Sequence, residues 1–265
     1  MATVSRRIFL KASGAAALTP ASVDAAQRAG VKPAPGTART TAAVGQASHA
    51  AGDASPGYLF FNAPEAAFVE AAVVRLIPAD ELGPSALEAA VPTYIDRQLH
   101  GAWGAGERFY RSGPWDAAAA PTQGYQLPFT PAELFRTALR GLRDDLERTG
   151  QSAFDKLSGD DQDVYLTQLQ TTSRDLAGVP SNVFFESLLA ITIEGYFSDP
   201  AYGGNKDMAA WKMIGFPGAY ASYYDLVDQY GVAFTAAPRG LAQDRAGHVQ
   251  PMPATAAAPT KRKGS

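Results

Sequence analysis

The chain has 265 residues, of which 46% are hydrophobic and 18% charged, and its formal net charge at pH 7 is −3. This length suits one domain of ordinary size with tails, and the charge balance lacks the basic excess that a nucleic-acid partner requires. Cysteine is absent, which excludes disulfides, thiolate zinc sites, cysteine-ligated iron–sulfur clusters, c-type haem attachment and a cysteine nucleophile. The histidines His49, His100 and His248 lie too far apart in sequence to share a helical turn, so a metal cluster built on them is not expected.

The N-terminal residues have the pattern of an export signal. The segment Ser5-Arg6-Arg7-Ile8-Phe9-Leu10-Lys11 matches the twin-arginine pattern S-R-R-x-F-L-K, and the apolar run in residues 12–18 is far shorter than a membrane span. We therefore expect residues 1–26 to be a twin-arginine signal peptide and the protein to reside in the periplasm. The residues expected to form the export signal are Arg6, Arg7, Phe9 and Leu10.

Twin-arginine export carries chains that have already folded. Such a chain usually holds a cofactor, folds fast, or travels bound to a protein that holds a cofactor. The sequence shows no cofactor motif of its own. This combination is the first indication of function, because it favours a chain that travels with a cofactor-bearing partner.

Composition divides the chain into a body and two tails. Residues 27–57 are rich in Ala, Gly, Pro, Ser and Thr without periodicity, which is typical of a flexible linker. Residues 236–265 have a similar composition and end in a short basic cluster, and we expect them to form a disordered, solvated tail. The folded body is therefore predicted to comprise residues 58–235.

Helix caps recur through this body, and no run alternates convincingly at the period of two that a half-buried strand shows. Asn62 predicts a first helix that ends at Pro78. Ser85 predicts a second, interrupted helix that runs to Leu99, and Pro92 should either break or restart it, since proline removes a helical hydrogen bond.

Further helices are expected along the rest of the body. Residues 130–133, T-P-A-E, form a capping box with proline at the first helical position, and the helix behind it ends at Gly150. Ser158 caps the next helix, Ser181 begins the most apolar one, and a last helix is expected over residues 219–230. The predicted fold is all-α: an irregular helical bundle around the helix that begins at Ser181, with long ordered loops.

Two acidic groups resemble metal or catalytic sites but have structural explanations. The three aspartates of residues 160–163 follow Ser158 in the first turn of a predicted helix, where the helix dipole stabilises negative charge. A structural role is therefore favoured over a metal site. Asp144 and Asp145 are expected to pair with Arg148 on an exposed helical face.

Two further patterns are also set aside. Residues 101–106, G-A-W-G-A-G, have the wrong glycine order for a dinucleotide-binding loop, and no strand precedes them. His100 with Glu107 or Asp96 could imitate an acid/base pair. A lone histidine at a helix end is more often structural, however, and no serine nucleophile elbow accompanies it.

The stretch 195–218, between two predicted helices, concentrates aromatic residues, glycines and an Asn-Lys-Asp triplet. A loop of this length is costly as a simple connection, and Tyr, Trp, Phe and Met are enriched in interface cores. Gly203 and Gly204 would let the backbone approach a partner closely. Alternatively, the stretch is an internal loop whose aromatic side chains cover the chain's own core, and composition favours the two interpretations about equally.

The same stretch resembles the signature of the gluconate 2-dehydrogenase subunit 3 family, G-Y-F-[ST]-[DN]-P-x-Y-G-G-N-x-D-x-x-x-W-x-x-I-G-[FY]-P-G. Every fixed position is matched, from Gly195 to Gly218. The segments Leu76-Ile77-Pro78 and Ile95-Asp96-Arg97-Gln98-Leu99 are similar to further landmarks of the family, and the twin-arginine leader is similar to that of many members. The resemblance covers about residues 58–230.

This resemblance implies a partner subunit rather than a catalyst. Members accompany a large FAD-containing dehydrogenase of the glucose–methanol–choline group, which oxidises a sugar, sugar acid or polyol, and in several complexes a cytochrome c subunit joins them. The small subunit is thought to stabilise the flavoprotein and to carry it through the twin-arginine translocase. The resemblance thus assigns FAD to the partner, and we expect no cofactor, metal or catalytic residue in this chain.

We expect residues of the signature to form or buttress the interface with the flavoprotein. They are Tyr196, Tyr202, Gly203, Gly204, Asn205, Lys206, Asp207, Trp211, Phe216 and Pro217. If Trp211 is central to that interface, Trp211→Ala should cost about 2 kcal/mol or more of binding free energy. Two alternatives remain: a stand-alone exported enzyme, or a periplasmic sugar-binding module in which Tyr202 stacks on sugar rings.

Overall fold

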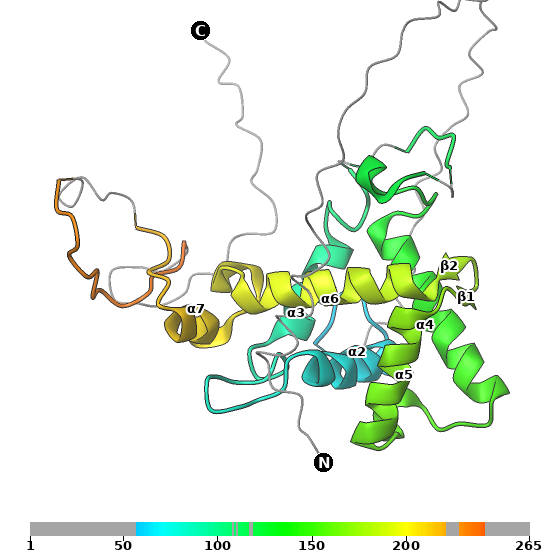
Figure 1. The fold of residues 1–265 in the computed structure, drawn as a ribbon. Coiled ribbons are helices and arrows are strands. Elements are labelled where there is room, and N and C mark those ends of the chain that lie inside the picture. Colours follow the sequence, from blue (N-terminus) through cyan, green and yellow to red (C-terminus); the bar gives the residue numbers. More distant parts are fainter. Residues whose placement is uncertain (1–56, 108, 110, 117–118, 221–227, 242–265) are drawn as a thin grey trace, which may run out of the picture. The chain divides into compact units, whose positions relative to one another are not determined.

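The computed structural model describes residues 57–107, 109, 111–116, 119–220 and 228–241, all within one compact unit. These residues form a mainly α-helical domain (Figure 1), so the predicted all-α class is confirmed. The elements are α2 (Ala63–Leu76), α3 (Val91–His100), η1 (Pro121–Gln123), α4 (Pro131–Arg148), η2 (Phe154–Lys156), α5 (Gly159–Thr171), β1 (Asp175–Leu176), β2 (Val179–Pro180), α6 (Ser181–Phe197), η3 (Pro200–Tyr202), η4 (Lys206–Met208) and α7 (Ala209–Ile214).

Some of the sequence predictions concern residues outside this described part. They are the signal peptide at 1–26 with Arg6, Arg7, Phe9 and Leu10, the linker at 27–57 except its last residue, the tail beyond 241, and residues 221–227 of the last expected helix. These assignments stay predictions.

The helix caps read from the sequence at Asn62, Thr130 and Ser158 are confirmed. The Asn62 side chain accepts the backbone N–H of Glu65, whose carboxylate accepts the Asn62 N–H in return, and this capping box begins α2. The same reciprocal pair joins Thr130 and Glu133 at the start of α4. The Ser158 hydroxyl accepts the backbone N–H of residue 161, so the acidic turn that follows it is an ordinary helix start.

The second helix begins later than its cap suggested. Ser85 and Glu88 hydrogen-bond to each other and close a turn, but α3 starts only at Val91 because Ala90 takes a left-handed backbone conformation with φ 60°. Pro92 then occupies the first helical turn, where its missing N–H costs nothing. The interruption expected at Pro92 is therefore a restart.

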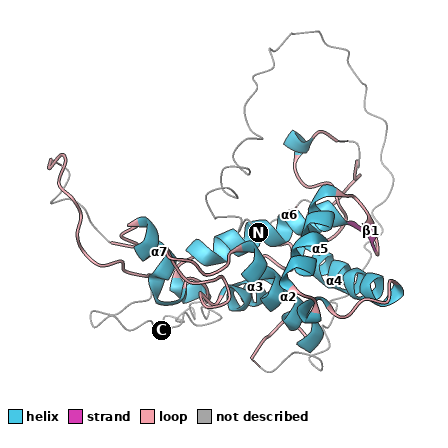
Figure 2. Cartoon of the chain, turned by 60° about the horizontal axis from the view of Figure 1, so that its bottom comes forward, coloured by secondary structure: helices cyan, strands magenta, loops and turns pink. Residues whose placement is uncertain are grey.

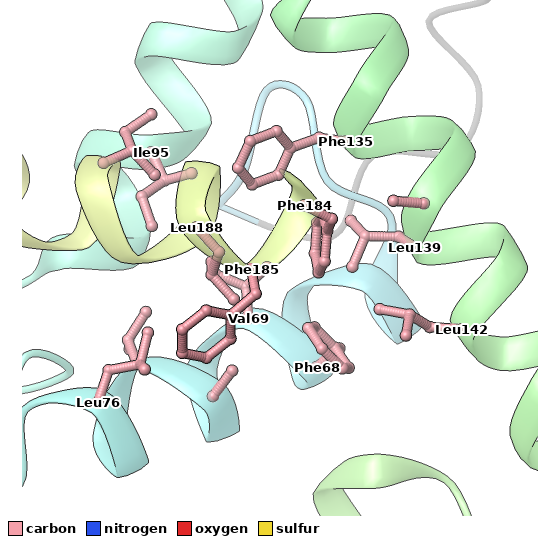
Figure 3. Close-up of a cluster of buried hydrophobic side chains, with 14 of the residues drawn as sticks. Phe68, Val69, Leu76, Ile95, Phe135, Leu139, Leu142, Phe184, Phe185 and Leu188 are labelled. Carbon is pink, nitrogen blue, oxygen red and sulfur yellow. The ribbon is translucent and has the colours of Figure 1, made fainter. Parts of the chain in front are cut away.

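The core is built around α6, which contacts α2, α3, α4 and α5 (Figure 1). Figure 2 shows strand only at the β1–β2 position, where the two short strands pair antiparallel. The side chains of α6 enter the core between α2 and α4 (Figure 3). The central buried residues are Phe68, Val69, Ile95, Phe135, Leu142, Phe184, Phe185 and Leu188. Burying each of these side chains contributes roughly 1.5–3 kcal/mol of hydrophobic free energy.

None of the described helices is long and apolar enough to cross a membrane.

The segment before α2 is held from two sides. Asp96, in α3 and only 2% exposed, accepts the three consecutive backbone N–H groups of residues 59–61 at 2.7 to 3.0 Å. From α4, the Arg136 guanidinium donates to the Phe60 carbonyl at 2.7 Å and lies over the Phe60 ring, while it also pairs with Glu65. The residues entering α2 are thereby fixed to both α3 and α4.

The pair expected on an exposed face of α4 is only partly exposed. The Asp145 side chain is 12% exposed and pairs with both Arg148 and Arg174, and it accepts the Tyr165 hydroxyl at 3.4 Å. The Arg174 guanidinium lies 5.0 Å from the centre of the Tyr165 ring. The predicted pairing with Arg148 is confirmed. The predicted exposure was wrong for Asp145, because contacts from α5 and from residue 174, which are distant in sequence, cover it.

The burial of Tyr165 predicts a loss of stability at alkaline pH. Burial raises the pKa of Tyr165 to about 12, with the Arg174 cation opposing and the Asp145 carboxylate adding to the effect. Because an unfolded tyrosine ionises near pH 10, the stability tied to the neutral phenol is complete below about pH 10 and is lost between about pH 10 and 12. We expect the free energy of unfolding to fall by about 1.4 kcal/mol per pH unit there from this group alone.

Urea unfolding, followed by helical circular dichroism from about pH 9 to 11.5, measures this slope. Tyr165→Phe should remove its share of the slope, whereas Tyr230→Phe, at a position 91% exposed, should leave it unchanged. Equal slopes in the wild type and in Tyr165→Phe would contradict the prediction.

Candidate functional site

The signature begins in the last turn of α6, where it packs against α3. Gly195 lies beneath Tyr94 so closely that a β-carbon there would be 2.7 Å from the Tyr94 ring. Tyr196 is 1% exposed, and its hydroxyl donates to the Pro84 carbonyl at 2.8 Å. These first residues of the signature therefore join α6 to the elements before and within α3.

The remainder of the signature is not the simple loop that the sequence analysis expected. Asp199 accepts the N–H of Ala201 at 2.9 Å and caps η3, and η4 leads directly into the short helix α7. The prediction missed α7 because its six residues are too few to show a helical period.

Asn205 organises these short elements from the inside. It is fully buried in a left-handed conformation with φ 46°. Its amide donates to the Ser198 carbonyl at 2.9 Å, and its side-chain oxygen accepts the N–H of Ala210 at 3.0 Å. Asp207 and Met208 are also left-handed, with φ of 58° and 54°. Conformations of this kind cost about 1–2 kcal/mol each and persist where surrounding contacts hold them, as the two Asn205 bonds do here.

The two signature glycines permit close contacts within the chain itself. A β-carbon on Gly204 would lie 2.1 Å from the Gly195 carbonyl oxygen, so only glycine lets this backbone rest on the end of α6. Gly203 has φ 105°, and the Arg97 guanidinium lies against it, with Nη1 3.1 Å from where a β-carbon would be. The close approach that the sequence analysis expected toward a partner is here made to α6 and to α3.

Trp211 is the central interior side chain of the second half. It is 6% exposed, and its indole N–H donates to the Phe197 carbonyl at 2.8 Å. The Phe216 ring packs edge-on against it with centroids 5.1 Å apart. Gly218 lies against the same indole, since a β-carbon there would be 2.8 Å from it. Trp211 therefore fixes α7 to the end of α6.

The end of the signature is tied down by residues much later in the chain. Arg239 pairs with Gly218 in a bridge, donates its N–H to Pro217 and accepts the N–H of residue 219. The N–H of Leu241 donates to the second oxygen of Asp199 at 2.6 Å. The described chain thus continues in defined contacts past the body boundary predicted at residue 235.

The comparison with known protein families matches residues 63–218 to gluconate 2-dehydrogenase subunit 3. The chain belongs to this family. No curated protein and no solved structure matches it. The matched range contains the whole signature and the helices that support it, so the resemblance noted in the sequence is confirmed for the folded body.

In this family member the signature residues divide into an interior and an exposed set. The interior set, whose polar groups are used within the chain, is Tyr196, Gly204, Asn205 and Trp211. The exposed set is Tyr202, Lys206, Asp207, Ile214 and Phe216. Gly203 and Pro217 lie between these extremes. The residues predicted for the interface therefore fall in both sets, and the assignment of an interface to them stays a prediction.

Ile214, at 56% exposure, is an exposed apolar residue of the signature that is not among the ten interface residues named above. Its place three residues after Trp211 predicts the same helical face as that buried side chain, so the helical pattern gives no signal for its exposure.

The acidic side chains among the other polar candidates have structural partners in this family member, whereas His100 is simply exposed. Asp163 forms a bidentate pair with Arg75, and the described residues contain no group of three or more His, Cys, Asp or Glu side chains that could hold a metal ion. His100 is exposed, and Asp96 faces the backbone of residues 59–61. In the 101–106 turn, Gly104 packs on the Leu99 carbonyl, and so its glycines serve the chain's own packing.

Proposed function

We propose that this chain is the non-catalytic small subunit of a periplasmic FAD-dependent dehydrogenase of the glucose–methanol–choline type, acting on a sugar, sugar acid or glycoside. In this proposal it stabilises the catalytic flavoprotein and carries it through twin-arginine export. The observation that carries the proposal is the division of the signature. Its interior residues fix a rigid scaffold, and its exposed residues include Tyr202, Ile214 and Phe216, which a soluble chain gains little by exposing.

Membership in a family defined as a dehydrogenase subunit supports this function, since a subunit has partners. The acidic side chains described above support it as well. Asp96, Asp145 and Asp163 are each engaged by backbone or by arginine groups of this chain. Their oxygens therefore serve contacts that hold the fold together.

The proposed division of labour places FAD in the large subunit. A flavin site needs a finished fold around a bulky cofactor, so the cofactor is loaded before export and the complex crosses the membrane folded. The signal at Arg6 and Arg7 then serves both subunits. A cytochrome c subunit is a further partner that could join the two subunits in the complex.

The test is to isolate the tagged full-length chain from the periplasm and membranes of its own organism. We expect a yellow complex with a flavin absorbance spectrum and a second chain of much larger mass. In a strain carrying Arg6→Lys with Arg7→Lys, both the chain and the flavoprotein should remain in the cytoplasm, because twin-arginine recognition depends on that pair.

A matched strain with Lys11→Arg, which keeps the charge beside the motif, should export both chains normally. A colourless chain isolated alone would contradict the proposal, and sugar binding by that solitary chain would favour a binding module instead. Export of the flavoprotein despite the double substitution would contradict the carrier role.

A further inference from the structure

A recessed surface lies next to the start of the signature, between α4, α6 and the segment that joins α3 to α4. It is an apolar pocket of about 170 Å³. Aromatic walls come from Trp103, Phe109 and Tyr125 of the joining segment and from Phe135 of α4, and the α6 side carries Ala190 and Glu194. Core residues such as Phe135 form part of its wall, but no residue of the signature lines it.

The size of the pocket limits its occupant. A cavity of about 150 Å³ with apolar walls accommodates benzene, so this one has room for a single phenylalanine, leucine or methionine side chain. Small-molecule and cofactor sites are larger, at about 300–1,000 Å³. An apolar side chain presented by another polypeptide fits the pocket better than a free ligand does.

Three polar side chains line the pocket, and one of them, Glu194, favours a positively charged group on the occupant. The Tyr125 hydroxyl already donates to the Phe129 carbonyl, and the Ser187 hydroxyl to the Val183 carbonyl, each at 2.8 Å. Glu194 differs from both, because no group in the described part of the chain hydrogen-bonds to its carboxylate or forms an ion pair with it. An anion at the rim of an apolar pocket attracts a cationic side chain next to the apolar one.

The pocket is continuous with the signature. Glu194 immediately precedes Gly195, over which Tyr94 lies. Burial raises the pKa of Tyr94, and the nearby Glu194 carboxylate and Tyr202 hydroxyl raise it further. Tyr94 therefore lies near both the rim of the pocket and an exposed aromatic residue of the signature.

We propose that this pocket is a second attachment point for the flavoprotein and receives one apolar side chain from an extended segment of the large subunit. A lysine or arginine beside that side chain pairs with Glu194. The inference rests on the proposed function and deepens it, since it specifies the chemistry of the partner segment. Trp103, at 39% exposure, lines the pocket and is available for contact with the inserted side chain.

The absence of cysteine allows a direct test, because an introduced thiol is the only one in the chain. Ala190→Cys places it in the pocket wall at an exposed helical position, and Gln168→Cys places a control thiol on the exposed surface of α5. Maleimide labelling is measured on the full chain alone and in the isolated flavoprotein complex. In the complex we expect labelling at residue 190 to slow by about tenfold or more, since interface cores exclude water, while residue 168 labels equally in both.

The outcomes separate this inference from the proposed function. Equal labelling of residue 190 in the chain and in an intact yellow complex overturns the pocket inference and leaves the proposed function standing. Protection of residue 190 in the chain alone also overturns it, because a segment of the same chain would then occupy the pocket. If no flavoprotein is isolated with the chain, the proposed function fails and this inference fails with it.

A second comparison tests the charge. Glu194→Lys should raise the dissociation rate of the complex by about tenfold or more, because two cations would meet at the rim. Glu186→Lys makes the same change at an exposed position of the same helix and should leave the rate within about twofold. Equal rates for the two variants would overturn the assignment of a cationic partner residue.

Discussion

Asp96→Ala is expected to lower the free energy of unfolding by about 4 kcal/mol, because it strands three backbone donors at once, two of which are buried. The carboxylate is 2% exposed and accepts the N–H groups of residues 59–61, which lead into α2. A hydrogen bond to a charged acceptor contributes about 1.5–3 kcal/mol, and an unsatisfied buried donor costs about 1–3 kcal/mol. Water that reaches the site recovers part of this sum.

Urea unfolding of the full chain, followed by helical circular dichroism, measures the loss. Asp96→Asn keeps one acceptor oxygen but loses the charge and the other oxygen, so it should lose about 2 kcal/mol. Asp163→Asn is the matched control, because Asp163 meets Arg75 in a pair whose side chains are 50% and 32% exposed. That change should cost less than about 1 kcal/mol. An Asp96→Ala chain as stable as the Asp163→Asn chain would show that residues 59–61 do not need the carboxylate.

Trp211→Ala is expected to destabilise the isolated chain itself, by about 3–5 kcal/mol, as the truncation of a buried tryptophan does. The indole fills the space between α7 and the end of α6, and it contacts Phe216 and Gly218. This result differs from the binding loss of about 2 kcal/mol expected from the sequence for an interface residue. The substitution would weaken partner binding only indirectly, because Phe216 would lose the ring that holds it in position.

The indole N–H and the ring can be tested separately. Trp211→Phe keeps an aromatic ring but removes the donor to the Phe197 carbonyl, and should cost about 1–2 kcal/mol from the unsatisfied carbonyl and a smaller cavity. Tyr202→Ala, at an exposed position of the same signature, should change the stability of the isolated chain by less than about 0.5 kcal/mol. Equal unfolding midpoints for Trp211→Ala and Tyr202→Ala would contradict the interior assignment of Trp211.

Local signals in the sequence predicted much of the helical framework. Capping boxes at Asn62 and Thr130 and the cap at Ser158 depend on residues three positions apart, so they can be read from the chain. The central position of α6 followed from its apolar composition, because a helix that is apolar on all sides must be buried. The start of α3 was missed by a few residues, since the left-handed Ala90 leaves no sequence signal.

The interior of the candidate site could not be predicted in the same way. Whether Trp211 and Asn205 face a partner or the chain depends on contacts with Phe197 and Ser198, which residue types alone do not reveal. The role of Gly204 is equally hidden, because the atom it must avoid belongs to α6. Contacts across 20 or more residues, such as that of Arg239 with Gly218, require the fold. The sequence signature identified residues 195–218 as the candidate site, and the structure divides these residues into an interior and an exposed set.

The central claim is that the exposed aromatic residues of the signature bind a flavoprotein, and the most direct measurement is the affinity of the complex for a chain carrying Tyr202→Ala with Phe216→Ala. Both side chains are more than 40% exposed, so the isolated chain should fold as the wild type does. If they are interface hot spots, the complex loses about 2 kcal/mol or more, which is at least about 30-fold in Kd.

The matched control is Leu82→Ala with Val164→Ala, which removes two side chains that are 55% and 56% exposed outside the signature. With equal amounts of each tagged chain, the flavin absorbance recovered per chain measures binding. We expect most of the flavin absorbance to be lost from the preparation of the signature double variant and to be retained in that of the control. Full flavin recovery with the signature double variant would contradict the claim that this surface holds the flavoprotein.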